Sequence, residues 1–242
     1  MRDFVVTSLL AAVTLMVSTV KLPHAIQRSP SATPASFVPN LSGVWIRESD
    51  FAGLARDFGS KENPPFQPWA QTAYEARLRE LAKSESDPDT PTQHCNVPPG
   101  VPSVMLWPLP WEIILAHDRV IIIYEFESSV RQIFTDGRKH PKDLDATYMG
   151  HSIGWYEGET LVVDTTGFND KTWLDPGRRL LHTDALHVTE RIHRSDHDTL
   201  QVDYTIDDSK AYTKPWTQKK LFKLKPDWQI HEYVCMENNR DE

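Results

Sequence analysis

Short runs of alternating apolar and polar residues fill the chain from Trp111 onward, and this period is typical of β-strands. Tight turns such as Glu157-Gly158 separate the runs, and no helical pattern lies between them. Parallel neighbours would need long crossovers, so the pattern predicts an all-β fold: a single antiparallel β-barrel, with a sandwich as the alternative. With one earlier run, about ten strands are expected: 41–45, 111–116, 119–127, 130–135, 147–156, 160–166, 185–194, 199–206, 217–224 and 229–235.

The part of the chain before the strand runs is rich in proline. Of 18 prolines, 14 fall between Pro23 and Pro110, which indicates mostly irregular structure. Residues 68–83 are the exception, since Trp69, Tyr74 and Leu78 recur there at helical spacing after Pro68. We expect one N-terminal amphipathic helix there, beside a single barrel domain over 41–242 that follows a linker at 27–40.

The first residues have the order of a secretory signal peptide. Arg2 precedes an uncharged apolar stretch from Phe4 to Val20, and Pro23 and Ala25 follow. We expect residues 1–26 to be removed and the protein to be periplasmic or secreted. The alternative is an uncleaved anchor, which would be the only part to contact a membrane.

Export would place the two cysteines, Cys95 and Cys235, in an oxidising compartment. A disulfide between them would close most of the domain into one loop, worth on the order of 4 kcal/mol in the chain-entropy model. Two buried thiols are the alternative.

The charge of the chain argues against nucleic-acid binding. A formal net charge of -8 repels phosphate backbones, and no basic patch offsets it. The sequence leaves the oligomeric state open.

Four polar residues are candidates for chemistry because strand alternation places them with apolar neighbours. Glu190 shares a face with Leu186, Val188 and Ile192; the corresponding argument places Arg131 with Ile133 and His151 with Ile153. Asp164 shares a face with Val162, but Leu161 and Val163 leave the inward face of that strand ambiguous. A buried charge needs a partner. The set is therefore either a structural network or an acid/base site, with Glu190 or His151 transferring protons and Arg131 stabilising negative charge.

Ligand contacts are expected from other side chains on the same inward faces and from the tryptophans. Aromatic faces stack on rings of sugars and terpenoids. The candidates are Tyr124, Tyr204, Trp216 and Glu232.

Two further patterns do not support a site. His187 and His193 lie six residues apart on one expected strand, close to 20 Å at strand rise, so they cannot share a metal ion. Residues 150–154, Gly-His-Ser-Ile-Gly, match the nucleophile elbow in letters, but a strand and not a helix is expected to follow. No His-x-His or Cys-x-x-Cys pair occurs, so no metal is expected. No phosphate loop or dinucleotide fingerprint occurs either, so no cofactor is expected.

Several blocks of the sequence resemble a large family of exported bacterial proteins with no assigned function. The most specific block is EGETLVVDTTGF at 157–168; LHVTER at 186–191 and residues 232–235 also contribute. The resemblance implies export, an all-β domain and importance of Arg131, Asp164, Glu190, Asp207 and Glu232, but no reaction. Relatives more often have Asp or Asn at the position of His151. Gly43-Val44-Trp45 also resembles the Gly-x-Trp start of lipocalins.

These observations predict a lipocalin-like barrel that holds a small, partly apolar molecule in its cavity. If it is an enzyme, we expect a cofactor-independent lyase, isomerase or cyclase. The alternatives are a non-catalytic ligand- or carbohydrate-binding protein and a structural envelope protein.

Overall fold

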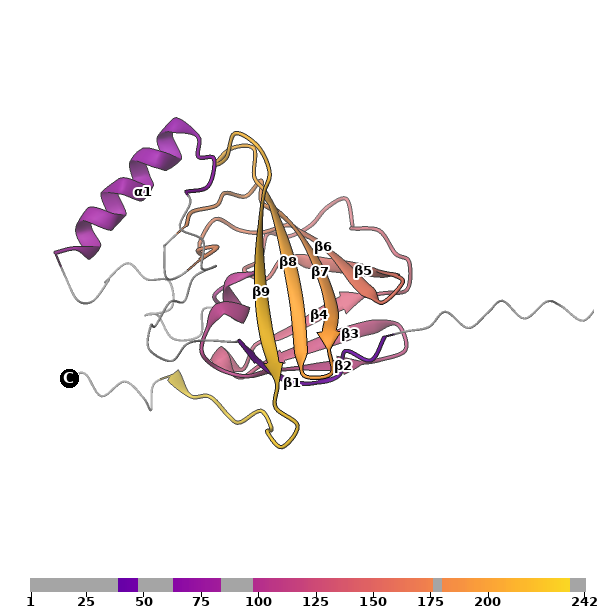
Figure 1. Cartoon of the computed structure of the whole chain (residues 1–242). Helices are drawn as coiled ribbons and strands as arrows, with labels where there is room; N and C mark the ends of the chain where they lie inside the picture. The colour runs from indigo at the N-terminus through magenta and orange to yellow at the C-terminus, as the bar shows by residue number, and fades with distance from the viewer. Residues whose placement is uncertain (1–38, 48–62, 84–97, 176–179, 236–242) are drawn as a thin grey trace, which may run out of the picture. The chain divides into compact units, whose positions relative to one another are not determined.

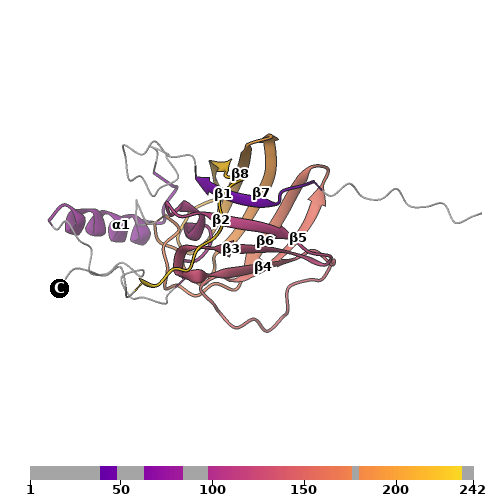
Figure 2. The same cartoon turned by 90° about the horizontal axis from the view of Figure 1, so that it is seen from below.

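The alternating runs form the wall of a closed barrel in the computed structural model, which describes residues 39–47, 63–83, 98–175 and 180–235. Each strand pairs with the next along the chain, and β9 closes the barrel by pairing with β1 (Figures 1 and 2). The nine strands are β1 (Gly43–Arg47), β2 (Trp111–Leu115), β3 (Arg119–Tyr124), β4 (Val130–Phe134), β5 (His151–Glu157), β6 (Thr160–Thr166), β7 (His187–Asp196), β8 (Thr199–Asp207) and β9 (Trp216–Leu224).

One neighbouring pair corrects the expected antiparallel arrangement. β4 and β5 run parallel, with Ile133 opposite Ser152 and Phe134 opposite Ile153, whereas all other pairs in the barrel are antiparallel. Residues 135–150 make this possible, because a connection of a dozen or more residues can return the chain to the end where it started. The barrel is therefore mixed.

The expected tenth strand does not form. Residues 229–234 follow β9 without strand pairing, although Ile230, Glu232 and Val234 alternate as a strand would. In a closed barrel β9 is already paired on both sides, with β8 and β1, so no free edge is left for another strand.

The expected helix is α1 (Pro68–Leu81), and it follows β1 and is therefore not N-terminal to the barrel. Its buried side includes Ala70 and Tyr74, whereas Trp69 and Leu78 are 49% and 39% exposed. Tyr74 stacks on Phe66 at 5.0 Å between ring centroids. The helix therefore buries a narrower apolar face than its sequence spacing predicts.

The loop between β8 and β9 holds the start of α1 in place. Gln67 donates its backbone N–H to the Ala211 oxygen at 2.8 Å, and Trp69 Nε1 donates to the Lys210 oxygen at 2.7 Å. Two short 3-10 helices, η2 (Ser103–Leu106) and η3 (Phe126–Ser128), lie in connections before β2 and after β3.

The inward face of each strand builds one core. On β8, Leu200, Val202, Tyr204 and Ile206 are completely buried, and the residues between them are partly exposed. On β5 the inward positions are Ser152 and Gly154, which are both small. A side chain at Gly154 would begin 2.8 Å from Ile133, so glycine leaves room for the neighbouring strand's side chain.

Residues 1–38 and Cys95 lie outside the described residues. The signal peptide, most of the linker and the disulfide therefore stay predictions.

Candidate functional site

Arg131 and Glu190 meet inside the barrel, as strand alternation predicts. They extend from β4 and β7, their side chains are 2% and 0% exposed, and they form an ion pair. Arg131 Nη1 donates to Glu190 Oε1 at 3.1 Å, and Nη2 contacts Oε2. Arg131 also donates from Nε to Ser152 Oγ at 3.0 Å and from Nη2 to Thr165 Oγ1 at 2.8 Å. We call these four residues the inner cluster.

The charges of the inner cluster compensate each other. Burial is the largest effect and lowers the pKa of Arg131, but the coulombic interactions and hydrogen bonds of Glu190 and Tyr124 together outweigh it and raise the pKa above its ordinary value. Taking both charges out of water is costly, so the pair is weak evidence for net stability. Removing either charge would nevertheless strongly destabilise the folded protein, because the remaining charge would stay buried without a partner.

Both expected ligand-binding tyrosines lie beside the inner cluster. Tyr124 and Tyr204 are 1% and 0% exposed, and Tyr204 donates its hydroxyl to Met105 Sδ at 3.4 Å. Burial raises the pKa of Tyr124 to about 12 and that of Tyr204 well above its ordinary value, so both are neutral phenols. With exposed fractions this low, almost no water-sized space remains beside them.

The Gly-His-Ser-Ile-Gly segment is not a nucleophile elbow. Ser152 is 2% exposed, on the inner face of β5, and its hydroxyl is hydrogen-bonded with Arg131 and with Thr165 Oγ1 at 3.0 Å. β5 then passes through a tight turn into β6 instead of a helix. The serine therefore serves the inner cluster.

A second polar group lies on the outer face of β5, β6 and β7. Its centre is Asp164, whose Oδ1 contacts His187 Nε2 and whose Oδ2 lies 3.3 Å from His140 Nε2. His140 Nδ1 lies 2.8 Å from His151 Nδ1. These four residues form a continuous hydrogen-bonded chain of ionisable groups, which we call the outer chain.

The outer chain is half-exposed, and the pKa values of its members are shifted in different directions. The hydrogen bond with His187 is the main cause of a lowered pKa at Asp164, and the same bond raises the pKa of His187. His151 behaves in the opposite way, because burial, and then the charges of His140 and Arg138, lower its pKa. Around neutral pH Asp164 is therefore ionised and His151 neutral.

Gly150 fixes the position at which His151 enters the sheet. Its φ is +66°, a left-handed conformation that favours glycine, and a side chain there would begin 2.8 Å from the Thr166 backbone oxygen. The next residue, His151, pairs with Thr166 across β5 and β6. The left-handed turn at Gly150 therefore leads directly into β5 and places His151 beside β6.

The Phe134 ring on β4 supports the imidazole of His151. The two rings stack with centroids 5.5 Å apart and an angle of 25°. The guanidinium of Arg138 lies over Phe134 at 3.9 Å from its centroid and donates hydrogen bonds to both carboxylate oxygens of Asp136. A positive charge, an aromatic ring and an imidazole are therefore packed together.

The prediction that His151 faces the core together with Arg131 and Glu190 is wrong. Ser152 occupies the inner position, so its neighbour His151 points outward. Similarly, Thr165 points inward and Asp164 outward.

The sequence interpretation missed His140 and did not connect His187 with Asp164. The β6–β7 register pairs Asp164 with Thr189, which places His187 one diagonal step away on the same face. The signal that could have found this pair is therefore the outward alternation of β6 and β7. His140 gives no such signal, because it lies in the connection between β4 and β5.

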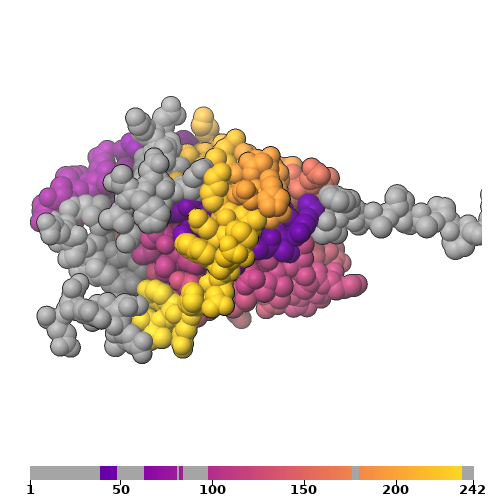
Figure 3. Space-filling view, turned by 60° about the horizontal axis from the view of Figure 1, so that its bottom comes forward, coloured from indigo at the N-terminus to yellow at the C-terminus, as the bar shows by residue number. Residues whose placement is uncertain are grey.

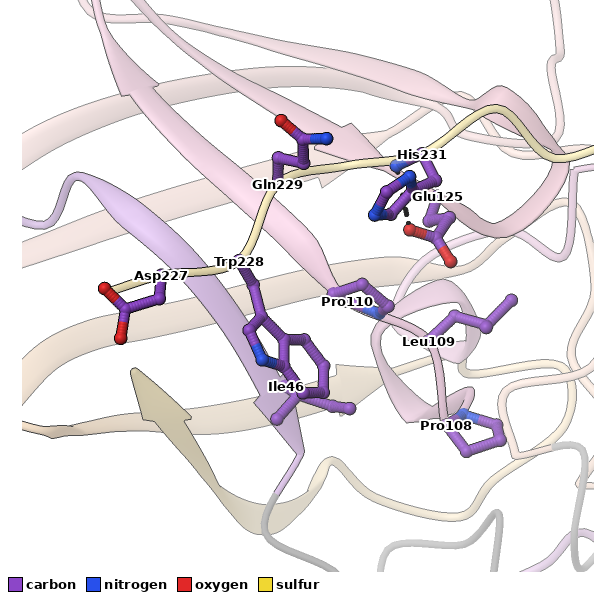
Figure 4. A pocket seen from close by; sticks show the side chains of 9 residues that line it. All are labelled: Ile46, Pro108, Leu109, Pro110, Glu125, Asp227, Trp228, Gln229 and His231. Atoms are coloured by element: carbon purple, nitrogen blue, oxygen red, sulfur yellow. Dashed lines mark hydrogen bonds between the residues drawn. The ribbon is translucent and has the colours of Figure 1, made fainter. Parts of the chain in front are cut away.

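A groove on the outside of the barrel has the size of a small-molecule site. Its volume is about 700 Å³, and it lies between the segment after β9, the end of β1 and the residues leading into β2. Figure 4 shows its lining side chains, with Asp227 at one end and Glu125 and His231 at the other. The lining consists of Ile46, Pro108, Leu109, Pro110, Glu125, Asp227, Trp228, Gln229 and His231.

The segment after β9 forms the outer wall of this groove, and it is fixed on both sides. Lys225 donates its backbone N–H to the Val44 oxygen at 2.8 Å, and His231 donates its backbone N–H to Glu125 Oε2 at 3.0 Å. Figure 3 shows the yellow C-terminal part of the described chain beside indigo β1. Between these anchors the indole of Trp228 remains 48% exposed.

The remaining predicted residues are dispersed. Trp216 is 9% exposed and packs edge-on against Tyr212 with ring centroids 5.4 Å apart. Glu232 is exposed in the segment after β9 and not on a strand face, so its expected inward position is wrong. Cys235 lies at the end of the same segment.

The chain matches no protein-family model and no curated protein. Within the described ranges, no group of three or more His, Cys, Asp or Glu side chains is arranged to hold a metal ion. Nor does this part of the chain contain a helix with the length and apolar character needed to cross a membrane. What the structure defines is a closed nine-stranded mixed β-barrel with a charged interior, a half-exposed histidine–aspartate chain and an outer groove.

Proposed function

We propose that this protein binds a small, partly apolar molecule, and that the binding site is the groove outside the barrel wall. The observation that carries the proposal is a concave space of about 700 Å³ with an exposed indole in it. Ligand pockets commonly enclose a few hundred to about 1,000 Å³ and combine an apolar lining with a few polar groups. Ile46, Leu109 and Trp228 provide such a lining.

The groove favours ligands that are neutral or positively charged. Glu125 and Asp227 contribute carboxylates toward its two ends, and among the described residues no lysine or arginine lines it. Lys225 lies nearby, but its Nζ is 5.2 Å from the Trp228 ring centroid, where the ring attracts it. An apolar ring system that carries hydroxyl or amino groups fits this chemistry, with the ring against Trp228.

The barrel interior offers less support for a ligand. Arg131, Glu190, Tyr124 and Tyr204 are 0–3% exposed, and the inner cluster satisfies its own charges. Because these charges are already paired with each other, Arg131 and Glu190 fit the structural alternative better than acid/base chemistry. Neither of the two pockets described, in the groove and around Arg194, includes these residues.

We further propose that the protein works outside the cytoplasm and that Cys235 pairs with Cys95. The Arg2-led apolar run and the two-cysteine count support this. The bridge would fix the chain beyond the groove's outer wall. Intact-mass analysis of protein recovered from the cell envelope, with and without reduction, checks both points: a start between residues 23 and 31, and no titratable thiol before reduction.

Fluorescent probes of different charge test the groove. We expect neutral N-phenyl-1-naphthylamine and cationic rhodamine 6G to bind, and anionic 1-anilinonaphthalene-8-sulfonate to bind more weakly. Trp228→Ala is expected to weaken binding of the neutral probe about tenfold, the equivalent of about 1.4 kcal/mol.

Trp155→Ala is the matched control, because Trp155 is 44% exposed on β5 and does not line the groove. Equal loss in both variants, or no binding of the neutral probe to the wild-type protein, would contradict the proposal.

A further inference from the structure

The carboxylate of Asp164 determines where the hydrogens of its two neighbouring imidazoles lie. An ionised carboxylate only accepts hydrogen bonds, so His140 Nε2 and His187 Nε2 each carry a hydrogen and donate it to Asp164. Neutral His140 then has its lone pair on Nδ1. Asp164 thus sets the tautomer of His140 in the way that a carboxylate orients the base of a hydrolase triad.

The tautomer of His140 in turn sets that of His151. Their Nδ1 atoms are 2.8 Å apart, so one hydrogen lies between them. Because His140 Nδ1 accepts, His151 Nδ1 donates, and the lone pair of neutral His151 is on Nε2. Within the part of the chain that the structure describes, no group is hydrogen-bonded to this nitrogen. The outer chain therefore ends in a proton acceptor on a half-exposed side chain.

We propose that Asp164, His140 and His151 form a proton relay, in which His151 Nε2 is the general base for hydrolysis of a small uncharged ester. His151 Nε2 takes a proton from water while the water oxygen attacks the ester carbonyl. The hydrogen between the imidazoles moves to His140 Nδ1, which places the positive charge beside Asp164. The proton then returns through the same path to the departing alkoxide, so ester and water give acid and alcohol.

The surroundings of His151 suit this step. Its lowered pKa keeps it neutral, and thus able to accept a proton, at neutral pH. Arg138, which lies over Phe134 and is paired with Asp136, contributes to the lowered pKa of His151. His151 is the catalytic residue in this scheme, and His140 and Asp164 are positioning residues.

The first test reads the tautomer directly in the full chain. In ¹⁵N-histidine-labelled protein at pH 7.5, the ring nitrogens of His151 are assigned from the signals lost in His151→Gln. We expect a protonated Nδ1 and an unprotonated Nε2 at His151, and a shift toward the opposite tautomer in Asp164→Asn. A protonated Nε2 in the wild-type protein would overturn the proposal. His151→Gln serves only for the assignment, and its remaining histidine signals show whether it is folded.

The second test measures hydrolysis of p-nitrophenyl acetate, a small uncharged ester. General-base catalysis commonly contributes a factor of about 10² or more, so we expect His151→Gln to lose about a hundredfold in rate above background. His197→Gln is the matched control, because His197 is 85% exposed and pairs with Asp198 away from the relay. Equal rates in His151→Gln and the wild-type protein would overturn the proposal. None of the relay residues lines the groove, so this activity is separate from ligand binding there.

Discussion

The inner cluster and the outer chain use the same strands in opposite ways. Ser152 and Thr165 point into the barrel and hydrogen-bond Arg131, whereas their immediate neighbours His151 and Asp164 point outward. A shift of one residue along a strand therefore separates two sets of polar groups on opposite sides of the wall.

The two groups differ in what remains available for chemistry. Every charge of the inner cluster is paired inside the barrel, where Arg131 and Glu190 are 3% and 0% exposed. The outer chain is partly solvated, and it ends in a nitrogen of His151 without a hydrogen-bond partner among the described residues. Burial and saturation mark a structural group, while partial exposure and an incomplete hydrogen-bond pattern mark a reactive one.

The largest effect is expected from breaking the inner ion pair. Glu190→Gln keeps the side-chain shape but leaves the charge of Arg131 buried without compensation, so we expect the free energy of unfolding to fall by about 3–5 kcal/mol. Urea denaturation followed by circular dichroism measures this.

The matched control for this substitution is Glu157→Gln, which removes an exposed ion pair with Arg191 and is expected to leave stability unchanged within error. The double variant Arg131→Met/Glu190→Leu removes both charges and is expected to regain most of the lost stability. Equal stability of Glu190→Gln and the wild-type protein would show that the inner cluster is not held as a charged pair.

A smaller effect is expected from the hydroxyl that completes the inner cluster. Thr165→Val removes an acceptor of Arg131 Nη2 with little change of volume, and we expect a loss of about 1–3 kcal/mol. Thr166→Val is the control on the adjacent, partly exposed position of β6. The comparison uses the same denaturation measurement. If the two variants were equally stable, the inward assignment of Thr165 would lose its energetic support.

The face of a strand could be read from the sequence where its inner positions are apolar. Leu186, Val188 and Ile192 identify the inner face of β7 and its extension, and so they place Glu190 correctly. On β5 the same rule fails, because the inner positions are Ser152, which hydrogen-bonds Arg131, and Gly154, which leaves room for Ile133. Counting apolar neighbours therefore selects the wrong face and misplaces His151.

Pairing across the barrel was harder to predict than the strands themselves. The alternating pattern gives the approximate positions of β1 to β9, but it cannot show that β9 meets β1, which leaves residues 229–234 outside the sheet and creates the groove wall. It also cannot show that residues 135–150 bring β5 parallel to β4 and His140 beside Asp164. Both features depend on closure and on a long connection, and neither has a local period.

The smallest expected effect is a pH dependence that belongs to the outer chain. Asp164, helped by the nearby charge of Asp207 on β8, raises the pKa of His187 above 6.5 against the effect of burial. A raised pKa stabilises the folded protein fully below about 6.5, and this contribution is lost as the pH rises through the folded value. The lowered pKa of Asp164 adds a contribution that is present above 3.8 and is lost as the pH falls through its folded value. The Asp164–His187 pair therefore stabilises the folded protein most between about pH 3.8 and pH 6.5.

The pair's contribution is the difference in unfolding free energy between the wild-type protein and His187→Gln, measured at pH 5.5 and pH 8.5. We expect this difference to be larger at pH 5.5, by less than about 1 kcal/mol because His187 and Asp164 are partly solvated. Comparing variants is necessary because His151 and buried His182 have lowered pKa values and act with the opposite sign, stabilising as the pH rises. Their contributions cancel in the difference. A difference that is larger at pH 8.5 would mean that His187 is not the cationic partner of Asp164, and the carboxylate would then be oriented toward His140 alone.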